Sequence, residues 1–463
     1  MADITGNKWQ KDNYNLNILT PTWLPHNDAA HRICSKILDE YDLQVYGAMG
    51  GRYQLVVASL LLAARQTLTS DLRDGKSIFL GCPRNNNYWS NYPRVGQKII
   101  LEVVDRLDGE LIYKRQDSGQ RVFYVTEWGN TAYDGITTMY EVDTVLLEDD
   151  DFNMAEYIEV GREAVKVNKA ESVWQHKIRK HNNRPKPRYG KAEAKKAFKA
   201  PLVKHVREVE ELNTFWQQHP LELAEGSWAA SATRVFHNGR LDAGGRFYGL
   251  WTGRDNFLRL QSKINGEDVC SIDINASQPV LFSGLMGVKL KDRDSWEDLY
   301  SEIADSLDNK PDEASQVRSI LKRVGMELVG TGNSSKAKPS DELVKDTGIT
   351  QNQWEEYRSA LIEHIPALEL MDGDHLNGAG IISYHESQMM LLSIQTLMAL
   401  GIPSYPVHDC LIVKASDKDT ALQVFRDTIR SYIFNHSSGR IDVMVAVSIE
   451  ESDSKTRIVG YYS

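Results

Sequence analysis

Two short apolar segments, far apart in the chain, each carry one aspartate, and this pair constrains the fold more than any other feature. The first segment, Ser271–Gln278, contains Asp273, and the second, Tyr405–Val413, contains Asp409. Each pattern predicts a β-strand with a carboxylate at or near its end, so we expect the two to face one another. Carboxylates are ligands that Mg²⁺ prefers, and a pair of such ions supports phosphoryl transfer.

At 463 residues the chain exceeds what one hydrophobic core usually supports, and we expect two or three domains. Its formal net charge of −10 bears on solubility, and a locally basic cleft can still bind nucleic acid. No apolar run approaches the roughly 18 residues that span a bilayer, so we expect no membrane contact. The polar start, Met1–Thr5, lacks secretory features, which predicts a cytoplasmic protein.

The four cysteines are spread over the chain without any C-x-x-C spacing. This distribution argues against a zinc module and against a disulfide framework. Cys270 and Cys410 fall on the two strand-like segments that carry the aspartates. We interpret these two thiols as small apolar packing groups.

Residues 1–150 are predicted to form an N-terminal domain that begins with a loosely structured, polar lead-in over residues 1–45. Four later segments carry helix or strand patterns: the helical patterns Tyr53–Ala64 and Val95–Leu107, and the strand patterns Leu111–Tyr113 and Val122–Val125. The turn residues Asp117-Ser118-Gly119 predict that the two strands form a hairpin, with Lys114, Arg115 and Arg121 on it. This order is typical of a DNA-binding winged helix, and also of any small α/β unit.

Charge changes sign along the next part of the chain. Residues 144–160 are acidic, whereas basic residues dominate from Lys177 to Arg207. The prolines Pro185 and Pro187 argue against one continuous helix, so we expect an extended basic connector. Such a run is either a solvated linker or a surface that follows a phosphate backbone, and both interpretations stay open.

Two further elements carry cationic groups. Arg246 follows the glycine pair Gly244-Gly245, which permits a tight backbone turn, although a lone G-G-R is most often a surface turn. Arg318 and Lys322 are four residues apart on a helical pattern, so they share one face of that helix. The apolar stripe of the same helix comprises Val317, Leu321, Val324 and Leu328. The two cations form either a solvated face or a grip for a triphosphate.

The remaining patterns predict helices, one loop and a closing strand. The helical patterns are Val206–Gln217, Ser277–Met286, Gln351–Ile365, His385–Leu400 and Lys418–Ile433. Residues Ser334–Thr347 are polar, and we expect a mobile loop there. The alternation over Ile441–Ile449 predicts a last strand that closes the sheet.

Four of these segments, in this order, resemble the palm and fingers of the superfamily that unites family A DNA polymerases with phage-type single-subunit RNA polymerases. The matching segments are Asp242–Arg246, similar to the D/T-x-x-G-R element; Asp273–Gln278, similar to motif A; Arg318-x-x-x-Lys322, similar to motif B; and Val407-His408-Asp409, similar to motif C. The resemblance covers about residues 230–463 and suggests a divergent phage or mobile-element member.

The resemblance implies an α+β fold with a polymerase palm, an antiparallel sheet with helices on one face. It places the palm at residues 230–463, with a helical fingers insertion at about 288–370. An N-terminal winged-helix-like domain would occupy residues 1–150. Residues 151–229 would form an acidic-to-basic linker and a reduced thumb.

The resemblance also implies roles for single residues. Asp273 and Asp409 would bind two Mg²⁺ ions. Arg318 and Lys322 would act on the triphosphate, and Gln278 would lie beside the nucleotide. Template or primer contacts are expected from three more residues: Arg246, Asp242 and His408. We expect His408 to orient its turn by hydrogen bonding, because Mg²⁺ prefers oxygen ligands.

Two positions depart from the family pattern and leave the choice of sugar open. Gln278 stands where family A DNA polymerases have a glutamate that blocks a 2′-hydroxyl and where the RNA polymerases have a small residue. Gly330 stands where a tyrosine normally ends the motif B helix.

The expected function is a template-directed DNA polymerase of a phage or mobile element, acting in the host cell cytoplasm if phage-encoded. Its partners would be a DNA template and primer, nucleoside triphosphates, and a replisome or processivity factor. One alternative is an RNA polymerase or primase on the same fold. Another is a non-catalytic, winged-helix replication initiator or regulatory DNA-binding protein.

Overall fold

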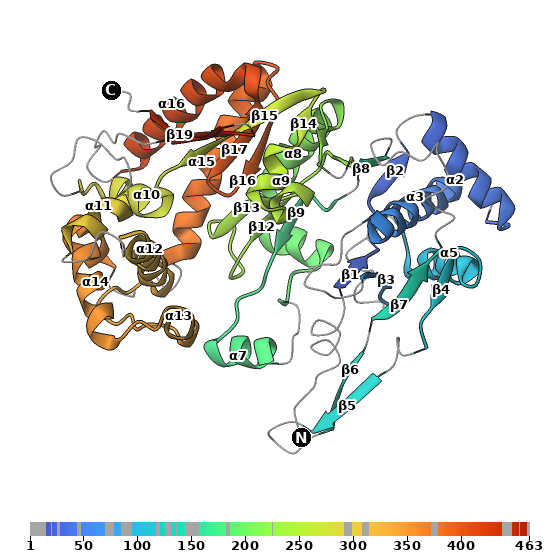
Figure 1. Ribbon diagram of the computed structural model, residues 1–463, viewed down its shortest axis with the longest axis horizontal. Helices are drawn as coiled ribbons and strands as arrows, with labels where there is room; N and C mark the ends of the chain where they lie inside the picture. Colours follow the sequence, from blue (N-terminus) through green and yellow to red (C-terminus); the bar gives the residue numbers. More distant parts are fainter. Residues whose placement is uncertain are drawn as a thin grey trace. The chain divides into compact units, whose positions relative to one another are not determined.

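The structure of the chain is a computed structural model (Figure 1). It describes residues 15–19, 21–25, 28–43, 48–69, 78–84, 95–116, 121–125, 131–135, 137–143, 157–160, 162–181, 186–224, 226–290, 299–307, 314–371, 378–437, 447–452 and 454–460. The chain divides into two compact units. Unit 1 comprises Met1–Ala164, Glu171–Lys186 and Trp216–Ala232, and unit 2 comprises Val165–Ala170, Pro187–Phe215 and Thr233–Ser463. Residues 151–229 thus contribute to both units, and the three-part division stays a prediction.

Unit 1 contains a four-stranded sheet in the order β1-β3-β7-β4. Its strands are β1 (Asn15–Ile18), β3 (Ile78–Cys82), β7 (Thr138–Val142) and β4 (Ile112–Lys114). β1 runs parallel to β3, and the other neighbours are antiparallel. The helix α3 (Ala48–Thr69) is apolar nearly all round because this sheet and the helices α2 (Asp28–Glu40) and α5 (Gln97–Leu107) all pack against it.

Unit 1 also contains smaller elements. They are the antiparallel pair β5 (Arg121–Val125) and β6 (Thr131–Gly135), the strands β2 (Trp23–Pro25), β8 (Tyr157–Glu159), β10 (Leu221–Glu222) and β11 (Trp228–Ala229), and the helix α7 (Val173–His181). β8 lies between β2 and β11. β10 pairs with β11.

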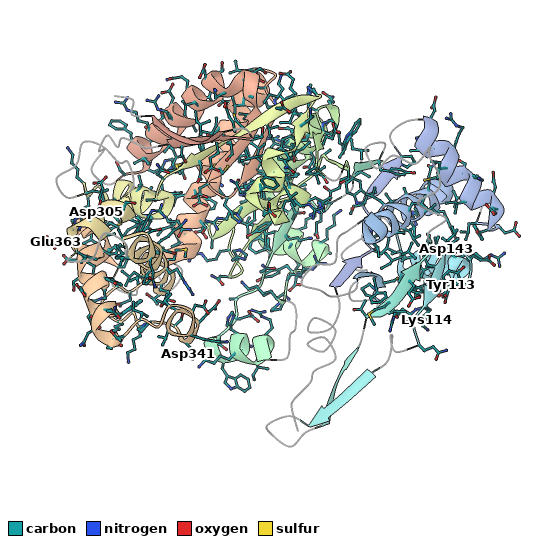
Figure 2. All side chains as sticks on the ribbon, viewed as in Figure 1. Tyr113, Lys114, Asp143, Asp305, Asp341 and Glu363 are labelled. Carbon is teal, nitrogen blue, oxygen red and sulfur yellow. The ribbon has the colours of Figure 1, made fainter. Side chains whose placement is uncertain are left out.

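The predicted basic hairpin is wrong, because β4 pairs with β7 while β5 pairs with β6. The pairing with β7 sets Ile112 opposite Val142, and Ile112 is fully buried there, so burial against a later strand outweighed local turn chemistry. The Tyr113 hydroxyl on β4 donates to Asp143 just after β7, at 3.0 Å (Figure 2). The predicted turn, residues 117–119, lies outside the described residues. The winged helix is not confirmed.

The prediction of a loosely structured lead-in is also wrong where the structure describes it. Residues 1–45 contain β1, β2 and α2. α2 forms because apolar side chains recur at helical spacing and share one buried stripe. The stripe comprises Ala30, Cys34, Ile37 and Leu38.

The extended basic connector is wrong as well, since helix α7 and helix α8 (Lys191–Gln218) occupy most of it. Pro187 precedes α8, and Pro185 lies outside the described residues. α8 bends at Lys199, whose φ of 46° and ψ of −128° are not helical, two residues before Pro201. Proline two residues after a break falls in the first turn of the following helical segment, where its missing N–H is tolerated.

Unit 2 contains an antiparallel sheet in the order β16-β17-β15-β18-β19. Its strands are β16 (Ser404–Val407), β17 (Cys410–Lys414), β15 (Glu267–Ile274), β18 (Val447–Glu451) and β19 (Ser454–Gly460), and the short β14 (Lys263–Ile264) pairs with the start of β15. The described part of the predicted strand Ile441–Ile449 is the start of β18. One further strand, β19, follows it, so the predicted closing strand is not the last.

A helical layer covers this sheet. It consists of α10 (Ser277–Met286), α15 (Gly378–Ala399) and α16 (Lys418–His436), which pack against one another and against β16 and β17 (Figure 1). A second, three-stranded sheet consists of β9 (Val165–Val167), β12 (Thr233–Phe236) and β13 (Gly244–Tyr248), and β13 packs on α15. The antiparallel sheet and helical layer predicted for this region are therefore present.

The region predicted as an insertion is mostly helical where it is described. Its elements are α11 (Leu299–Ser306), α12 (Ala314–Thr331), α13 (Asp341–Thr347), α14 (Gln351–His364) and η3 (Pro366–Leu370). α13 lies inside the stretch predicted as a mobile loop. It forms because the Ser340 side chain accepts a hydrogen bond from the Leu343 backbone and caps the helix, with Asp341 and Glu342 in the first turn.

The four cysteines are buried and unbridged. Within the described ranges, no helix combines the length and apolar character needed to cross a membrane.

Candidate active site

Asp273 and Asp409 lie close together at one end of two neighbouring strands, Asp273 within β15 and Asp409 just before β17. Antiparallel pairing sets Asp273 on β15 opposite Cys410, the first residue of β17. The next residue, Ile274, donates its backbone N–H to the Asp409 carbonyl oxygen at 3.4 Å. The register of one sheet thus brings together two carboxylates that are 136 positions apart in the sequence (409 minus 273).

Strained backbone flanks both aspartates. His408 forms with Asp409 the two-residue turn between β16 and β17, and its φ is 58°. Ala276, which caps the start of α10 after β15, has a φ of 50°. Left-handed backbone is unfavourable for alanine and only tolerated by histidine, and such positions cluster at functional sites. At both positions the backbone turns sharply close to the aspartate.

Both aspartates line one cavity of about 300 Å³ in unit 2. Residues from five regions of the chain share its wall. Besides the aspartates, the residues predicted for the site that line it are Arg246, Gln278, Arg318, Lys322 and His408. The structure therefore gathers one or more residues of each of the four sequence motifs around a single cavity.

One predicted site residue lies elsewhere. Asp242 does not belong to the described lining of the cavity; its carboxylate is paired with Arg240 at 2.7 Å and is largely exposed. The guanidinium of Arg240 holds the pKa of Asp242 below its usual range. The predicted nucleic-acid contact of Asp242 stays a prediction.

Burial shifts the pKa values of the groups at this end of the strands. Asp409 is half-buried, and loss of solvent raises the pKa of its carboxyl group, while Arg246 and Lys322 act in the opposite direction. Loss of solvent also lowers the pKa of His408. The Nδ1 atom of His408 has no hydrogen-bond partner among the described residues, so that atom does not fulfil the predicted orienting role.

The cations opposite come from α12. Arg318 and Lys322 lie one turn apart on the face of this helix that lines the cavity, together with Met326. The predicted apolar stripe of α12 is buried, which orients the cationic face outward from the core. Lys322 is exposed, and its charge acts on Asp409.

The glycine pair before Arg246 is not a surface turn. Gly244 and Gly245 begin the strand β13, with φ of 81° and 79°. A Cβ at Gly244 would come within 2.4 Å of the His237 ring, and one at Gly245 within 2.8 Å of the Ser387 hydroxyl oxygen on α15. Only glycine fits either position, because both the backbone angles and the close packing exclude a side chain.

Sequence reasoning missed a buried carboxylate beside the site. Glu386 on α15 is fully buried. It accepts hydrogen bonds from Arg246 at 2.7 Å and from the Ser277 hydroxyl at 3.2 Å. Burial raises the pKa of Glu386 to about 7, with Arg246 opposing and Asp409 reinforcing the shift. Arg246 thus lines the cavity and also forms an ion pair with the buried Glu386.

A second missed residue is Tyr300 on α11, which also lines the cavity. A Cβ added to Gly325 of α12 would lie 3.3 Å from its hydroxyl oxygen, so glycine lets the two helices approach closely. A tyrosine distant from every motif gave no signal in the sequence.

No family model and no curated protein matches this chain. A DNA polymerase domain is a distant structural neighbour. It is the POL domain of Pol1 from M. smegmatis, in a complex with DNA primer-template and dNTP, with 12% sequence identity and a TM-score of 0.33. The match covers 56% of this chain and 54% of that one, so this chain spans about half of its length.

Proposed function

We propose that this protein is a template-directed nucleotidyltransferase, a DNA polymerase in which the cavity between β15, β17 and α12 is the active site. One observation carries the proposal. An aspartate on β15, an aspartate in the turn just before the neighbouring β17, and two cations on α12 line the same cavity, although they come from distant parts of the sequence. Carboxylates that bind metal ions opposite cations that bind phosphates are the components that phosphoryl transfer requires.

The donor set fits Mg²⁺ held together with a substrate. Within the described residues, no group of three or more Asp, Glu, His or Cys side chains is placed to hold a metal ion. Mg²⁺ is usually bound by one or two carboxylates plus substrate phosphates and water, so Asp273 and Asp409 suffice. Two bound Mg²⁺ ions would lower the pKa of an attacking hydroxyl and neutralise the leaving pyrophosphate.

The chain's own residues would then divide the work. Asp273 and Asp409 would hold the ions, at positions set by the register of the sheet. Arg318 and Lys322 bind the triphosphate and offset its developing charge, since cationic groups contribute most where charge builds up. Arg246, paired with Glu386, and Gln278 both line the cavity; in this proposal Arg246 would contact the primer or template phosphate, and Gln278 would lie beside the nucleotide.

A primer-extension assay run in parallel with dNTPs and rNTPs tests this function. The proposal predicts that the purified protein extends a primed DNA template with dNTPs in the presence of Mg²⁺ and that EDTA abolishes the extension. Extension with rNTPs alone would instead assign an RNA polymerase or primase. No extension with either set would support the non-catalytic DNA-binding alternative and overturn the proposal.

A further inference from the structure

Behind the cavity wall lies a buried cation that the proposed reaction does not use. Arg234 on β12 is 0% exposed, and burial lowers the pKa of its guanidinium to about 10. A buried charged pair is often no more stabilising than apolar groups of the same volume, because desolvation offsets the attraction. Stability alone is therefore a weak explanation for an arginine at this position.

The contacts of Arg234 converge on the glycine pair. Its Nε donates to the Gly245 carbonyl oxygen at 2.8 Å, and its second terminal nitrogen donates to the Ser387 hydroxyl at 3.3 Å. The Ser387 hydroxyl lies 3.1 Å from the Gly244 carbonyl oxygen, within hydrogen-bond reach. Together, Arg234 and Ser387 engage both glycine carbonyls of β13.

Other groups hold the guanidinium of Arg234 itself. Glu208 on α8 lies 3.7 Å from it, and the rings of Phe236 and Phe247 lie 5.1 and 5.2 Å from its centre. His205 contacts it at 3.3 Å. A guanidinium fixed on all sides is a rigid support, since its planar fork gives two donors in a set geometry.

The sequence neighbours of Gly245 and Ser387 form the ion pair at the cavity. Gly245 precedes Arg246 in the sequence, and Ser387 follows Glu386. Arg246 and Glu386 are joined at 2.7 Å. β13 is therefore attached to α15 at two successive positions, one behind the cavity and one in its wall.

We propose that Arg234 and Ser387 are positioning residues that hold the Gly244-Gly245 backbone so that Arg246 reaches Glu386 and presents its guanidinium to the cavity. The proposal rests on the proposed function for its catalytic consequence. Neither residue lines the described cavity, so nucleotide binding by Arg318 and Lys322 does not depend on them.

A matched pair of serine variants on α15 tests the clamp. Ser387 and Ser393 are both buried, and each hydroxyl lies within hydrogen-bond distance of a carbonyl oxygen of the same helix, that of Tyr384 at 2.8 Å and that of Met389 at 2.9 Å. Only Ser387 also contacts Gly244 and Arg234 in the described structure. Ser387→Ala and Ser393→Ala therefore remove equivalent hydroxyls, and only the first releases β13.

For Ser387→Ala we expect kcat for nucleotide incorporation to fall about tenfold with KM for the triphosphate unchanged, because misplacement of a positioned group costs rate rather than binding. Ser393→Ala should leave both constants unchanged. As a readout independent of activity, phenylglyoxal should modify Arg246 several-fold faster in Ser387→Ala than in Ser393→Ala, measured by mass spectrometry of the folded proteins.

Equal modification of Arg246 in the two variants would overturn the clamp, whatever the activity. Equal kcat values in two active variants would overturn its catalytic role. If wild-type protein incorporates no nucleotide, the proposed function fails, while the modification rates still decide whether Arg234 and Ser387 position Arg246.

Discussion

The two walls of the cavity rest on different supports. On one wall, Asp273 and Asp409 are short side chains at strand ends, and their separation is set by the hydrogen-bonded register of the sheet. On the other, Arg318 and Lys322 are long side chains on one face of a helix, and Lys322 is exposed. A short carboxylate is placed by its backbone, whereas a long cation adapts to its ligand. The first wall should therefore tolerate substitution less than the second.

The carboxylate wall should show the largest effect. Asp273→Asn keeps the shape of the side chain and removes its charge, so we expect primer extension to fall about 1,000-fold. The matched control is Asp268→Asn on the same strand, whose carboxylate is 71% exposed and paired with Lys263. Steady-state incorporation of one nucleotide measures both. Equal rates for the two variants would remove Asp273 from the reaction.

The cation wall should be less sensitive. Arg318→Ala or Lys322→Ala should lower kcat/KM for the triphosphate about 100-fold each, because one cation remains to offset the phosphate charge. Arg323→Ala, on the same helix but paired with Asp346 at 3.1 Å, should have little effect. If Arg323→Ala impairs the enzyme as strongly as the other two, the cationic face of α12 does not bind the nucleotide.

The buried carboxylate beside the first wall should make stability depend on pH. Burial raises the pKa of Glu386 from 4.5 to about 7, so the folded protein holds this proton more tightly than the unfolded chain does. Its contribution to stability is therefore present below the unfolded pKa and is lost as the pH rises through the folded pKa.

Glu386→Gln has no such proton. The free energy of unfolding of wild type, relative to Glu386→Gln, should fall by about 2 kcal/mol between about pH 5 and about pH 7.5, measured by urea denaturation. A difference that stays constant over this window would show that Glu386 does not titrate on folding.

The smallest effect concerns competition between protons and metal. Partial burial raises the pKa of Asp409, and a carboxylate must lose its proton to bind Mg²⁺. The Mg²⁺ concentration for half-maximal extension should thus decrease as the pH rises and Asp409 loses its proton. Asp268→Asn, in which the site is intact, should show the same trend. A constant Mg²⁺ requirement would contradict a shifted Asp409.

The sequence predicted the elements around the cavity because their patterns are local. The strand predicted from Ser271–Gln278 overlaps β15 (Glu267–Ile274), and the helix predicted over Ser277–Met286 is α10. The predicted basic hairpin does not form, because Ile112 pairs with Val142, about 30 positions further along the chain. No local pattern encodes that pairing.

The position of Glu386 in the sequence indicates a buried carboxylate. It lies on the apolar stripe of α15, four residues after the buried Ile382 and three before the buried Met389. A carboxylate inside such a stripe needs a buried partner. What the sequence could not supply was that partner, because Arg246 lies 140 residues away, on the strand β13.

The central claim is tested most directly by single-nucleotide incorporation on a primed DNA template with Mg²⁺, comparing wild type with Asp409→Asn. The account predicts rapid incorporation by wild type and a loss of about 1,000-fold in the variant, with both proteins folded. Incorporation by Asp409→Asn at the wild-type rate would contradict the assignment of this cavity as the active site.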